Sequence, residues 1–405
     1  MKDIRRFECT FKQIFKPVPG TSFNGLLNSN ATDIIIIGGG LAGLVSAIHL
    51  SKAGLSVIII EKNEYPKHKV CGEYVSNEVL PYLQQLGADP MTTGAKKINR
   101  FLLSTTRGKT IETKLPLGGF GVSRYTLDHF LFQHAVQNGC SVMQDTVSDV
   151  HFENDMFRVQ TKDGNEFTAR SVIGAFGKRS NLDVKLERTF IKDRSPFVAV
   201  KTHLAGDFPE DLVALHNFKG GYCGISKVEN GNINACYITN YSSFQQYRNT
   251  EAFRQEVLCR NPHLKRIFEN AVPVFEHPLT ISQVSFSNKT TVEGHMLMCG
   301  DAAGMIHPLC GNGMAMAIHS AKIASELILD YFNKRTISRT ELEQSYNQMW
   351  NAAFKTRVTT GRIVQPFFGK DGLTRLIMYG LTHIPGVLPA IIKHTHGKPL
   401  QLTTD

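Results

Sequence analysis

A glycine-rich segment is the first stretch of the sequence whose residue types could do chemistry. Residues 38–43 read Gly-Gly-Gly-Leu-Ala-Gly, which fits the spacing G-x-G-x-x-G. The β-branched run 33–37 precedes it and predicts a buried strand, and residues 41–53 follow with helical spacing. This order of strand, turn and helix is typical of a unit that binds the phosphates of a nucleotide.

Each glycine has a physical task in such a unit. Gly38 permits the tight turn, Gly40 lets the backbone approach a pyrophosphate, and Gly43 allows the helix to pack closely. The amides of Leu41 and Ala42 belong to the helix N-terminus, which offers N–H donors and the positive end of the helix dipole. We therefore expect these residues to hold an anionic phosphate group.

An acidic residue ends the second predicted strand. Residues 55–60 form an apolar run, and Glu61 and Lys62 follow it directly. This completes a βαβ unit, which implies a parallel sheet with a right-handed crossover. The Glu61 carboxylate would accept hydrogen bonds from ribose hydroxyls and would repel a 2′-phosphate. The sequence thus predicts an ordinary adenosine diphosphate moiety here, with Lys62 in the same site.

A second glycine-rich segment decides between the candidate dinucleotides. It runs over residues 300–313, after a predicted strand at 296–299 and before a long predicted helix at 313–332. Asp301 can accept hydrogen bonds from polyol hydroxyls, and the glycines at 311–313 let helix N-terminal amides approach a flat ring. Reduced flavin carries negative charge on that ring, which a helix N-terminus stabilises. We therefore expect FAD rather than NAD.

These segments resemble those of a known group of flavoproteins. The sequence is similar to the FAD-dependent oxidoreductases of the para-hydroxybenzoate hydroxylase fold, and most similar to their geranylgeranyl reductase and FixC-like group. The resemblance covers roughly residues 32–330. It rests on residues 38–43, Glu61, Ser123-Arg124, 173–177 and 300–301, and for the closer group on 66–73, 220–222 and 300–313.

The resemblance implies roles for single residues. Glu61 would hold the adenosine ribose, Val147 would contact adenine through its backbone, and Arg124 would lie along the diphosphate and ribityl chain of FAD. Asp301 would bind the ribityl chain or the diphosphate. A surface salt bridge is the alternative for Arg124, and a plain helix cap is the alternative for Asp301. The loop residues that would border the isoalloxazine ring are Pro308, Gly311, Asn312 and Gly313.

One position departs from the family pattern. Phe176 stands where the middle glycine motif usually has Asp, in a region that hydroxylases use around both FAD and the incoming nicotinamide cofactor. This argues against efficient use of NADPH and limits NAD(P)H to a transient electron donor. Lys178 and Arg179 follow directly, and they are either phosphate-attracting or solvated surface charges.

Two residues are candidates for a catalytic role. Cys71 lies in the segment that, in the resembling group, runs beside the flavin and the substrate cavity, and it is either a reactive thiol or a small core residue. His307, just before Pro308, would lie close to the flavin. It is either a general acid or base or a structural histidine.

The predicted fold class is α/β. A Rossmann-like FAD-binding domain of the glutathione reductase type, with a parallel sheet, is interleaved with an antiparallel-sheet substrate domain, and a helical C-terminal tail follows. Residues 98–122 and 197–286 are predicted as antiparallel strands, with a hairpin at 229–232. The predicted ranges are an N-terminal extension at 1–30, the FAD-binding domain at 31–96, 123–180 and 291–332, the substrate domain at 97–122 and 181–290, and the helical region at 333–405.

Composition and charge exclude several classes of protein. The 405 residues are 42% hydrophobic and 20% charged, which indicates a globular chain rather than a fibrous or disordered one. The formal net charge of +10 comes from scattered residues without a basic patch, so nucleic acid is not an expected partner. The eight cysteines show no metal-like spacing, and no apolar leader or membrane-spanning run appears, so we expect reduced thiols in a cytoplasmic protein.

The apolar tail 373–392 adds a hypothesis about partners. It is broken by glycine and proline, and basic residues flank it. It either covers the substrate entrance and touches a membrane or lipid-like substrate, or it forms ordinary core helices. The oligomeric state is left open.

The first expectation for function is FAD-dependent reduction of carbon–carbon double bonds in an isoprenoid or similar hydrophobic small molecule. The alternatives are a monooxygenase that hydroxylates an aromatic or polyketide substrate, and an electron-relay flavoprotein. The only tryptophan is Trp350, so the signature of tryptophan-type flavin halogenases is missing. The substrate, the electron donor and any covalent attachment of the flavin are not fixed by the sequence.

Overall fold

The computed structural model describes residues 31–193, 196–284, 286–306, 311–334, 337–364, 392 and 397–401. Contacts divide the chain after Ala31 into two units. The helices and strands given below belong to the second unit, Thr32–Asp405, apart from Ala31 at the start of β1. The predicted extension 1–30 and the tail 373–392, apart from Ile392, lie outside the described residues. None of the helices in the described ranges combines the length and apolar composition that crossing a bilayer requires.

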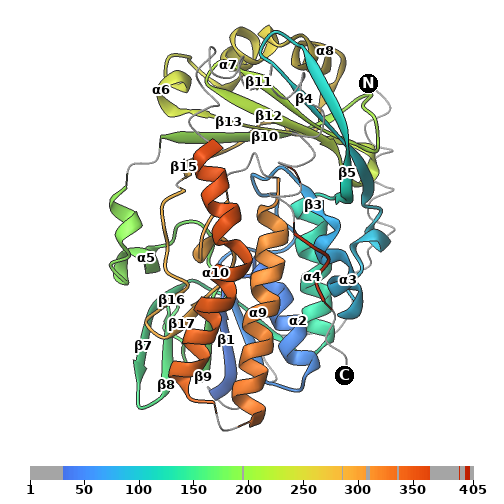
Figure 1. Cartoon of the computed structure of the whole chain (residues 1–405). Helices are drawn as coiled ribbons and strands as arrows, with labels where there is room; N and C mark the ends of the chain where they lie inside the picture. Colours follow the sequence, from blue (N-terminus) through green and yellow to red (C-terminus); the bar gives the residue numbers. More distant parts are fainter. Residues whose placement is uncertain are drawn as a thin grey trace, which may run out of the picture. The chain divides into compact units, whose positions relative to one another are not determined.

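An eight-stranded sheet contains the predicted βαβ unit. Its strands at the centre are parallel, with Ile34 opposite Val57 and Ile37 opposite Ile60. Ile34 and Ile36 are fully buried, as expected for a β-branched strand covered on both faces. The strand order is β16 (Val292–Glu293), β17 (Met296–Met298), β9 (Glu166–Gly174), β1 (Ala31–Ile37), β2 (Val57–Glu61) and β6 (Ser141–Gln144), with β8 (Met156–Thr161) on β9 and β7 (Val147–Glu153) on β8 (Figure 1).

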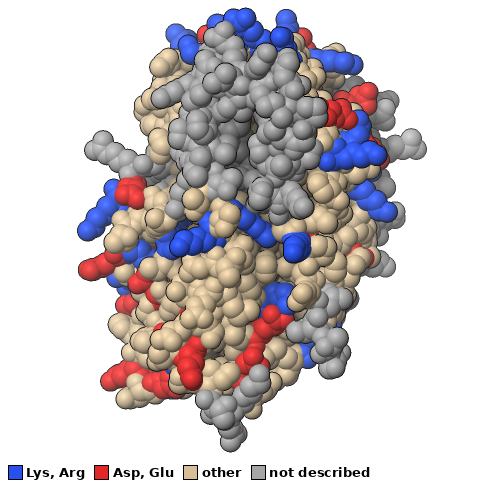
Figure 2. Space-filling view, in the orientation of Figure 1, with Lys and Arg blue, Asp and Glu red and all other residues tan. Residues whose placement is uncertain are grey.

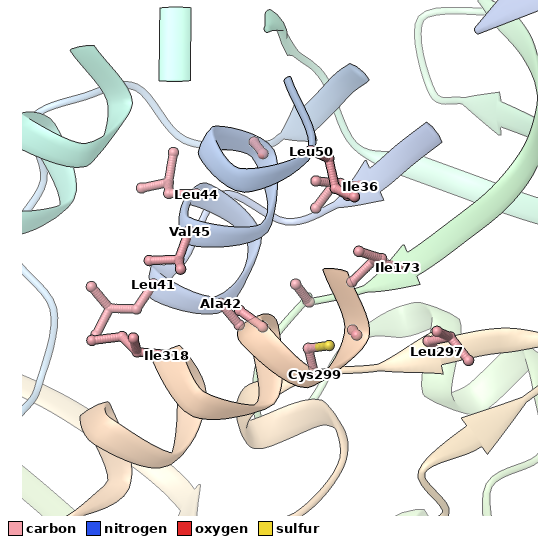
Figure 3. Packing of buried hydrophobic residues seen from close by; sticks show 14 of the residues in the cluster. Ile36, Leu41, Ala42, Leu44, Val45, Leu50, Ile173, Leu297, Cys299 and Ile318 are labelled. Carbon is pink, nitrogen blue, oxygen red and sulfur yellow. The ribbon is translucent and has the colours of Figure 1, made fainter. Parts of the chain in front are cut away.

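Long helices pack beside this sheet. α2 (Leu41–Lys52) contacts both α4 (Arg124–Gln137) and α9 (Gly313–Lys334), and α10 (Arg339–Val364) packs on α9 (Figure 1). In Figure 3, Ala42 of α2 points toward Cys299 at the end of β17, and Leu41 lies near Ile318 of α9. The two glycine-rich segments of the sequence therefore meet at one end of α2.

A second, nine-stranded sheet carries the rest of the strands. It is antiparallel except for the parallel pair β4 and β11, and the predicted hairpin at 229–232 joins β12 to β13. β3, inside the range 31–96, pairs with β5 of this sheet, so the chain crosses from one sheet to the other near residue 73. The order is β14 (Val272–Pro273), β10 (Phe197–Ala205), β13 (Ile233–Asn240), β12 (Gly221–Lys227), β11 (Leu212–Phe218), β4 (Lys96–Ser104), β5 (Thr110–Gly121) and β3 (Tyr74–Ser76), with β15 (Leu279–Val284) on β10.

The prediction of strands throughout residues 197–286 is wrong for residues 241–270. This stretch forms α6 (Tyr241–Phe244), α7 (Thr250–Glu256) and α8 (Pro262–Asn270). Asn249 and Asn261 cap α7 and α8 through their side chains, and Pro262 begins α8. These asparagine and proline signals were present in the sequence.

Short helical turns complete the described part of the chain. The α-helical ones are α3 (Leu80–Gln85) and α5 (Asn181–Lys185). The 3₁₀ turns are η1 (Asn77–Val79), η2 (Pro90–Thr93), η3 (Thr189–Lys192), η4 (Glu229–Gly231), η5 (Leu258–Arg260) and η6 (Gly300–Ala302).

Close packing at Gly43 gives a prediction about the fold. A Cβ atom on Gly43 would lie 2.1 Å from the carbonyl oxygen of Gly38, a backbone atom that cannot move aside freely. We expect Gly43→Ala to lower the free energy of unfolding by about 1–3 kcal/mol and to reduce bound FAD, because helix and turn must separate. Urea unfolding and the visible absorbance of the purified protein measure both effects.

Gly224→Ala is the matched control. The added Cβ on Gly224 would meet its nearest neighbour at 3.6 Å, an ordinary contact. Its unfolding free energy should stay within about 0.5 kcal/mol of wild type. Equal stability of the Gly43→Ala and wild-type proteins would contradict the packing argument.

Candidate functional site

The glycine turn after β1 has the geometry that a phosphate-binding loop requires. Gly38 has φ +101°, and a Cβ atom there would lie 2.6 Å from the carbonyl oxygen of Ala175. A Cβ atom on Gly40 would meet nothing closer than Arg124 Nη2, at 3.9 Å. The backbone of Gly40 is thus open for approach, whereas Gly38 and Gly43 are closed by backbone contacts.

The N-terminus of α2 keeps its donors available. Gly40 is the N-cap residue, and in the described part of the chain no side chain caps it. The first helical hydrogen bond runs from the N–H of Leu44 to the carbonyl of Gly40 at 2.9 Å. The amides of Leu41, Ala42 and Gly43 precede that bond, so they have no partner within the helix. Together with the helix dipole, this end of α2 suits an anion.

Glu61 ends β2 directly beside the glycine turn. Its side chain is buried and accepts hydrogen bonds from the Gly39 N–H at 2.7 Å and the Asn63 N–H at 2.9 Å. The N–H of Asp145 donates to the Glu61 carbonyl at 3.1 Å, which brings buried Val147 to the same end of the sheet. Lys62 is exposed. The residues expected around the adenosine part therefore lie together.

Tyr65 is a contributor that the sequence did not reveal. Its hydroxyl donates to the Gly39 carbonyl at 2.5 Å, and its ring stacks on Phe132 with centroids 4.6 Å apart. Burial raises the pKa of Tyr65, so the hydroxyl stays a donor. The polar side chains that surround this corner are Glu61, Asn63, Glu64, Tyr65, Lys67, Lys69 and Asp128.

Arg124 is an ion-paired residue that also faces the phosphate loop. Its Nε and Nη2 donate to the two carboxylate oxygens of Asp128 at 2.7 and 2.8 Å, and Lys69 donates to the same carboxylate at 2.7 Å. Burial opposes both charges, yet the ion pair raises the pKa of Arg124 and lowers that of Asp128. Two cations share one carboxylate, so this corner keeps positive charge for a diphosphate.

The second glycine-rich segment approaches the first through small residues. Gly300 has φ +59°, and a Cβ atom there would lie 3.3 Å from the Cβ of Ala42. Asp301 follows in η6, and its carbonyl oxygen accepts a hydrogen bond from Lys289 Nζ at 2.7 Å. That ammonium also donates to the Lys178 carbonyl at 2.7 Å, and burial lowers the pKa of Lys289 to about 8.

The middle glycine segment reaches the same point. Ala175 donates its N–H to the Ile37 carbonyl at 2.8 Å, and Phe176 follows with its Cα 2.8 Å from the Cβ position of Gly38. The unexpected Phe176 thus lies against the glycine turn, where the family pattern has a carboxylate. Its ring packs on the main apolar core.

The loop before α9 is described from Gly311 onward. Gly311 has φ +61° and lies beside the ring of Tyr74, to which a Cβ atom would come within 3.5 Å. Asn312 is fully buried, its carbonyl accepts the N–H of Met316 at 3.0 Å, and Gly313 begins the helix. The predicted residues His307 and Pro308 lie outside the described residues.

These features together fit FAD. The open backbone at Gly40, the free first turn of α2 and the charge of Arg124 suit a diphosphate. Within the described residues no hydrogen-bond donor engages the Asp301 carboxylate, although Arg124 and Lys178 lie within its electrostatic reach. The Asp301 carboxylate can therefore accept hydrogen bonds from polyol hydroxyls.

Cys71 is partly buried at the boundary of the two sheets. Burial raises its pKa, so its thiolate is disfavoured at neutral pH. Asn234 of β13 donates to the carbonyl oxygens of Cys71 and Gly72, at 3.3 and 2.8 Å. The segment that contains Cys71 is therefore fixed to β13 of the nine-stranded sheet.

A buried ionic cluster joins the two sheets, and its residues were not predicted as site residues. Glu73, with φ +54°, accepts hydrogen bonds from Lys201 Nζ, from His203 Nε2 at 2.7 Å and from the Arg124 N–H at 2.7 Å. Burial opposes the charge of Glu73, but the bond from His203 and the charge of Lys201 outweigh it and lower its pKa. The alternation of Lys201 and His203 on one strand face was the available signal.

The same face of the nine-stranded sheet continues as a buried apolar layer. Ala199 precedes Lys201 by two positions and lies opposite Ile238, which in turn lies opposite Tyr222. These residues form a buried cluster with Val284 and Phe286. Val70 and Met305, from the segments around Cys71 and after Asp301, pack against it.

Charges on the face drawn in Figure 2 are unevenly spread. Lys and Arg side chains cross the middle of the view in a band, and Asp and Glu side chains gather toward its lower end. The lower end is where β7, β8 and the first turns of α10 lie in Figure 1. A positive band at the middle of the molecule favours approach of anionic ligands.

Comparison with known proteins identifies the family. The model of the FAD binding domain matches residues 31–340. The chain therefore belongs to this family and is an FAD-dependent oxidoreductase. This confirms the predicted cofactor and the para-hydroxybenzoate hydroxylase type of fold.

Relatives cover most of the chain at low identity. Conditioned medium factor receptor 1 of Dictyostelium discoideum is 24% identical over 87% of this chain and 73% of its own. Digeranylgeranylglycerophospholipid reductase of Methanosarcina acetivorans is 26% identical over 81% of both chains. Menaquinone reductase of Mycobacterium tuberculosis is 24% identical over 74% of this chain and 77% of its own.

Solved structures share the fold. A flavoprotein/dehydrogenase from Cytophaga hutchinsonii superposes with a TM-score of 0.74 at 19% identity, covering 90% of this chain and 92% of that one. The flavin-dependent brominase Bmp2 superposes with a TM-score of 0.73 at 18% identity, covering 90% and 93%. At these identities the likeness concerns the fold alone.

The Arg124–Asp128 pair gives a prediction about pH. The pKa of Asp128 is lowered in the folded protein, so the pair stabilises above the ordinary carboxyl pKa and loses its effect as pH falls through the lowered value. Asp128→Asn should lower the free energy of unfolding by about 3 kcal/mol near neutral pH, because it leaves buried cations unpaired. The difference from wild type should shrink in acid.

Denaturant unfolding from about pH 7 to about pH 3 measures this effect. Asp207→Asn, at an exposed carboxylate, is the control and should follow wild type throughout. A difference between Asp128→Asn and wild type that stays constant over this range would contradict the argument.

Proposed function

We propose that the protein reduces carbon–carbon double bonds in an isoprenoid or similar lipid-like molecule. The observation that carries this proposal is the apolar face of the nine-stranded sheet, which borders the segment of Cys71 and the segment after Asp301. A face of Ala199, Tyr222 and Ile238 favours a ligand that is largely hydrocarbon. Two relatives named as reductases, of menaquinone and of digeranylgeranylglycerophospholipid, support the same class of substrate.

In this proposal separate segments of the chain would bind FAD. Glu61, Lys62 and Val147 would hold the adenosine end, and the amides of Leu41 to Gly43 with Arg124 would hold the diphosphate. Asp301 would accept hydrogen bonds from the ribityl hydroxyls, and residues 311–313 would border the ring. Bound FAD would supply the two-electron redox chemistry, and the chain supplies orientation and electrostatics.

The apolar face has a second task in the proposal. Ala199 and Ile238 would pack on the hydrocarbon chain and exclude water from the ring. The cluster of Glu73, Lys201 and His203 lies at the border of this face and holds it against the segment 69–73. The substrate would therefore lie between a fixed sheet and the flavin.

Reoxidation of reduced flavin tests this proposal. The holoenzyme is reduced with dithionite without oxygen and then mixed with geranylgeraniol or with its fully saturated analogue. We expect the absorbance of oxidised flavin to return with the alkene alone, and the product to gain two hydrogens for each double bond reduced.

Two other outcomes would overturn the proposal. Oxygen consumption that depends on an aromatic or polyketide substrate would establish a monooxygenase. Reoxidation only by a protein acceptor, with no small molecule turned over, would establish an electron relay.

A variant of the apolar face tests where the alkene binds. Ala199→Leu places extra volume opposite Ile238, and we expect alkene-dependent reoxidation to slow at least about 10-fold while the flavin spectrum stays unchanged. Val184→Leu, at a side chain 56% exposed on α5, is the matched control and should react like wild type. Equal rates for Ala199→Leu and wild type would show that this face is not part of the substrate site.

Phe176 gives a prediction about the electron donor. It lies against the glycine turn where the family pattern has Asp, so we expect NADPH to reduce the bound flavin slowly. The rate should stay below about 1 s⁻¹, the low end of ordinary turnover, whereas dithionite should reduce the flavin fully. Stopped-flow absorbance measures both reactions, and rapid, complete reduction by NADPH would contradict the expectation.

A further inference from the structure

A carboxylate outside the site described above connects four distant segments. Glu78 lies in η1, directly after β3, and is fully buried. Its Oε1 accepts a hydrogen bond from Asn312 Nδ2 at 2.8 Å and another from Arg357 Nη1 of α10 at 3.2 Å. One oxygen thus holds both the loop before α9 and the helix after it.

Residues 397–401, the C-terminal segment, lie against Oε2, the second carboxylate oxygen of Glu78. Among the described residues it has no hydrogen-bond partner. A Cβ atom on Gly397 would lie 1.8 Å from this oxygen and 2.2 Å from Arg357 Nη2. The backbone of Gly397 therefore lies so close to the ion pair that a side chain at this position would displace the carboxylate or the guanidinium.

A backbone hydrogen bond also joins Glu78 to the C-terminal segment. The carbonyl of Glu78 accepts the Leu400 N–H at 2.8 Å, and the side chain of Leu400 is buried in the main apolar core. Residues 397–401 therefore dock on Glu78 through both its side chain and its backbone. A fully buried carboxylate oxygen without a partner is costly, so its position calls for a reason beyond stability.

Asn312 supplies that reason. Its carbonyl accepts the first hydrogen bond of α9, from the Met316 N–H, and its side-chain amide is fixed by Glu78. The side chain and the backbone of Asn312 therefore link the Glu78 carboxylate to the first turn of α9.

We propose that Glu78 is a positioning residue for the flavin loop and that residues 397–401 are part of the support of the FAD ring. The inference rests on the proposed placement of residues 311–313 beside the isoalloxazine. It adds that the end of the chain, more than 80 residues after that loop, sets flavin affinity and flavin redox behaviour through one carboxylate.

Two variants disturb the carboxylate from opposite sides. Glu78→Gln keeps the shape but removes the charge that holds Arg357, and Gly397→Ala pushes a methyl group onto the carboxylate. For each we expect FAD to dissociate about 10-fold more readily, the visible flavin bands to shift, and the midpoint potential to change. Apoprotein titration with FAD, absorbance and dye-coupled redox titration measure these three quantities.

A double-mutant cycle separates positioning from general destabilisation. In a Glu78→Ala background the carboxylate is gone and Arg357, no longer held by it, can move away from the methyl group of Gly397→Ala. Gly397→Ala should then add less than a twofold further loss of FAD affinity. Lys398→Ala, at an exposed neighbour in the same segment, is the matched control and should leave all three measurements unchanged.

The outcomes decide the inference independently of the reaction catalysed. It is overturned if Gly397→Ala keeps the wild-type flavin spectrum and affinity, or if its effect is equally large in the Glu78→Ala background. It is also overturned if both variants lower only the thermal stability. All three measurements concern bound FAD and not the substrate. A failure of alkene reduction would therefore contradict the proposed function without affecting the role inferred for Glu78.

Discussion

The close approach of three backbone segments at the end of β1 is the constraint on which the rest of the structure depends. The turn at Gly38, the strand end at Ala175 and the turn at Gly300 meet around the start of α2. At each of these contacts a side chain would collide with main-chain atoms or come against a small neighbour, Ala42. Small residues are therefore required by packing as well as by the phosphates that they leave room for.

This constraint explains how charge and apolar surface are arranged around it. Charged and polar groups lie close to these three segments, namely Arg124, Asp301 and the free amides of α2. The nine-stranded sheet contributes a buried apolar cluster instead. Glu73 joins the two through Lys201, His203 and the backbone of Arg124. Such a buried ionic cluster contributes little net stability, but it allows only one relative placement of its partners.

Much of the phosphate end of the site could be predicted from the sequence. A glycine pattern, the strand before it, the helix after it and Glu61 all lie within about thirty residues, so local spacing determines their geometry. The position of Asp301 followed from the same logic applied to a second strand and helix. Local patterns describe these parts because each is built from consecutive residues.

Most of the contacts that the sequence did not reveal join residues far apart in the chain. Glu73 with Lys201 and Glu78 with Asn312 are separated by 128 and 234 positions, and Tyr65 reaches Gly39 from a loop outside the helices and strands. The hydrophobic periodicity of the sequence carries no information about such pairings. The helices within residues 241–270 were a different kind of error, because Asn249, Asn261 and Pro262 were local signals that favoured helix.

The order of the strands has a consequence for how the chain is made. α2 ends at Lys52, but its packing partner α9 ends only at Lys334, and β17 joins the sheet at Met296–Met298. At ordinary synthesis rates the ribosome needs roughly 15–60 s to extend the chain from one helix to the other. During that time α4 and β2 can already pack on α2, but the side of α2 that contacts α9 stays uncovered by its final partner.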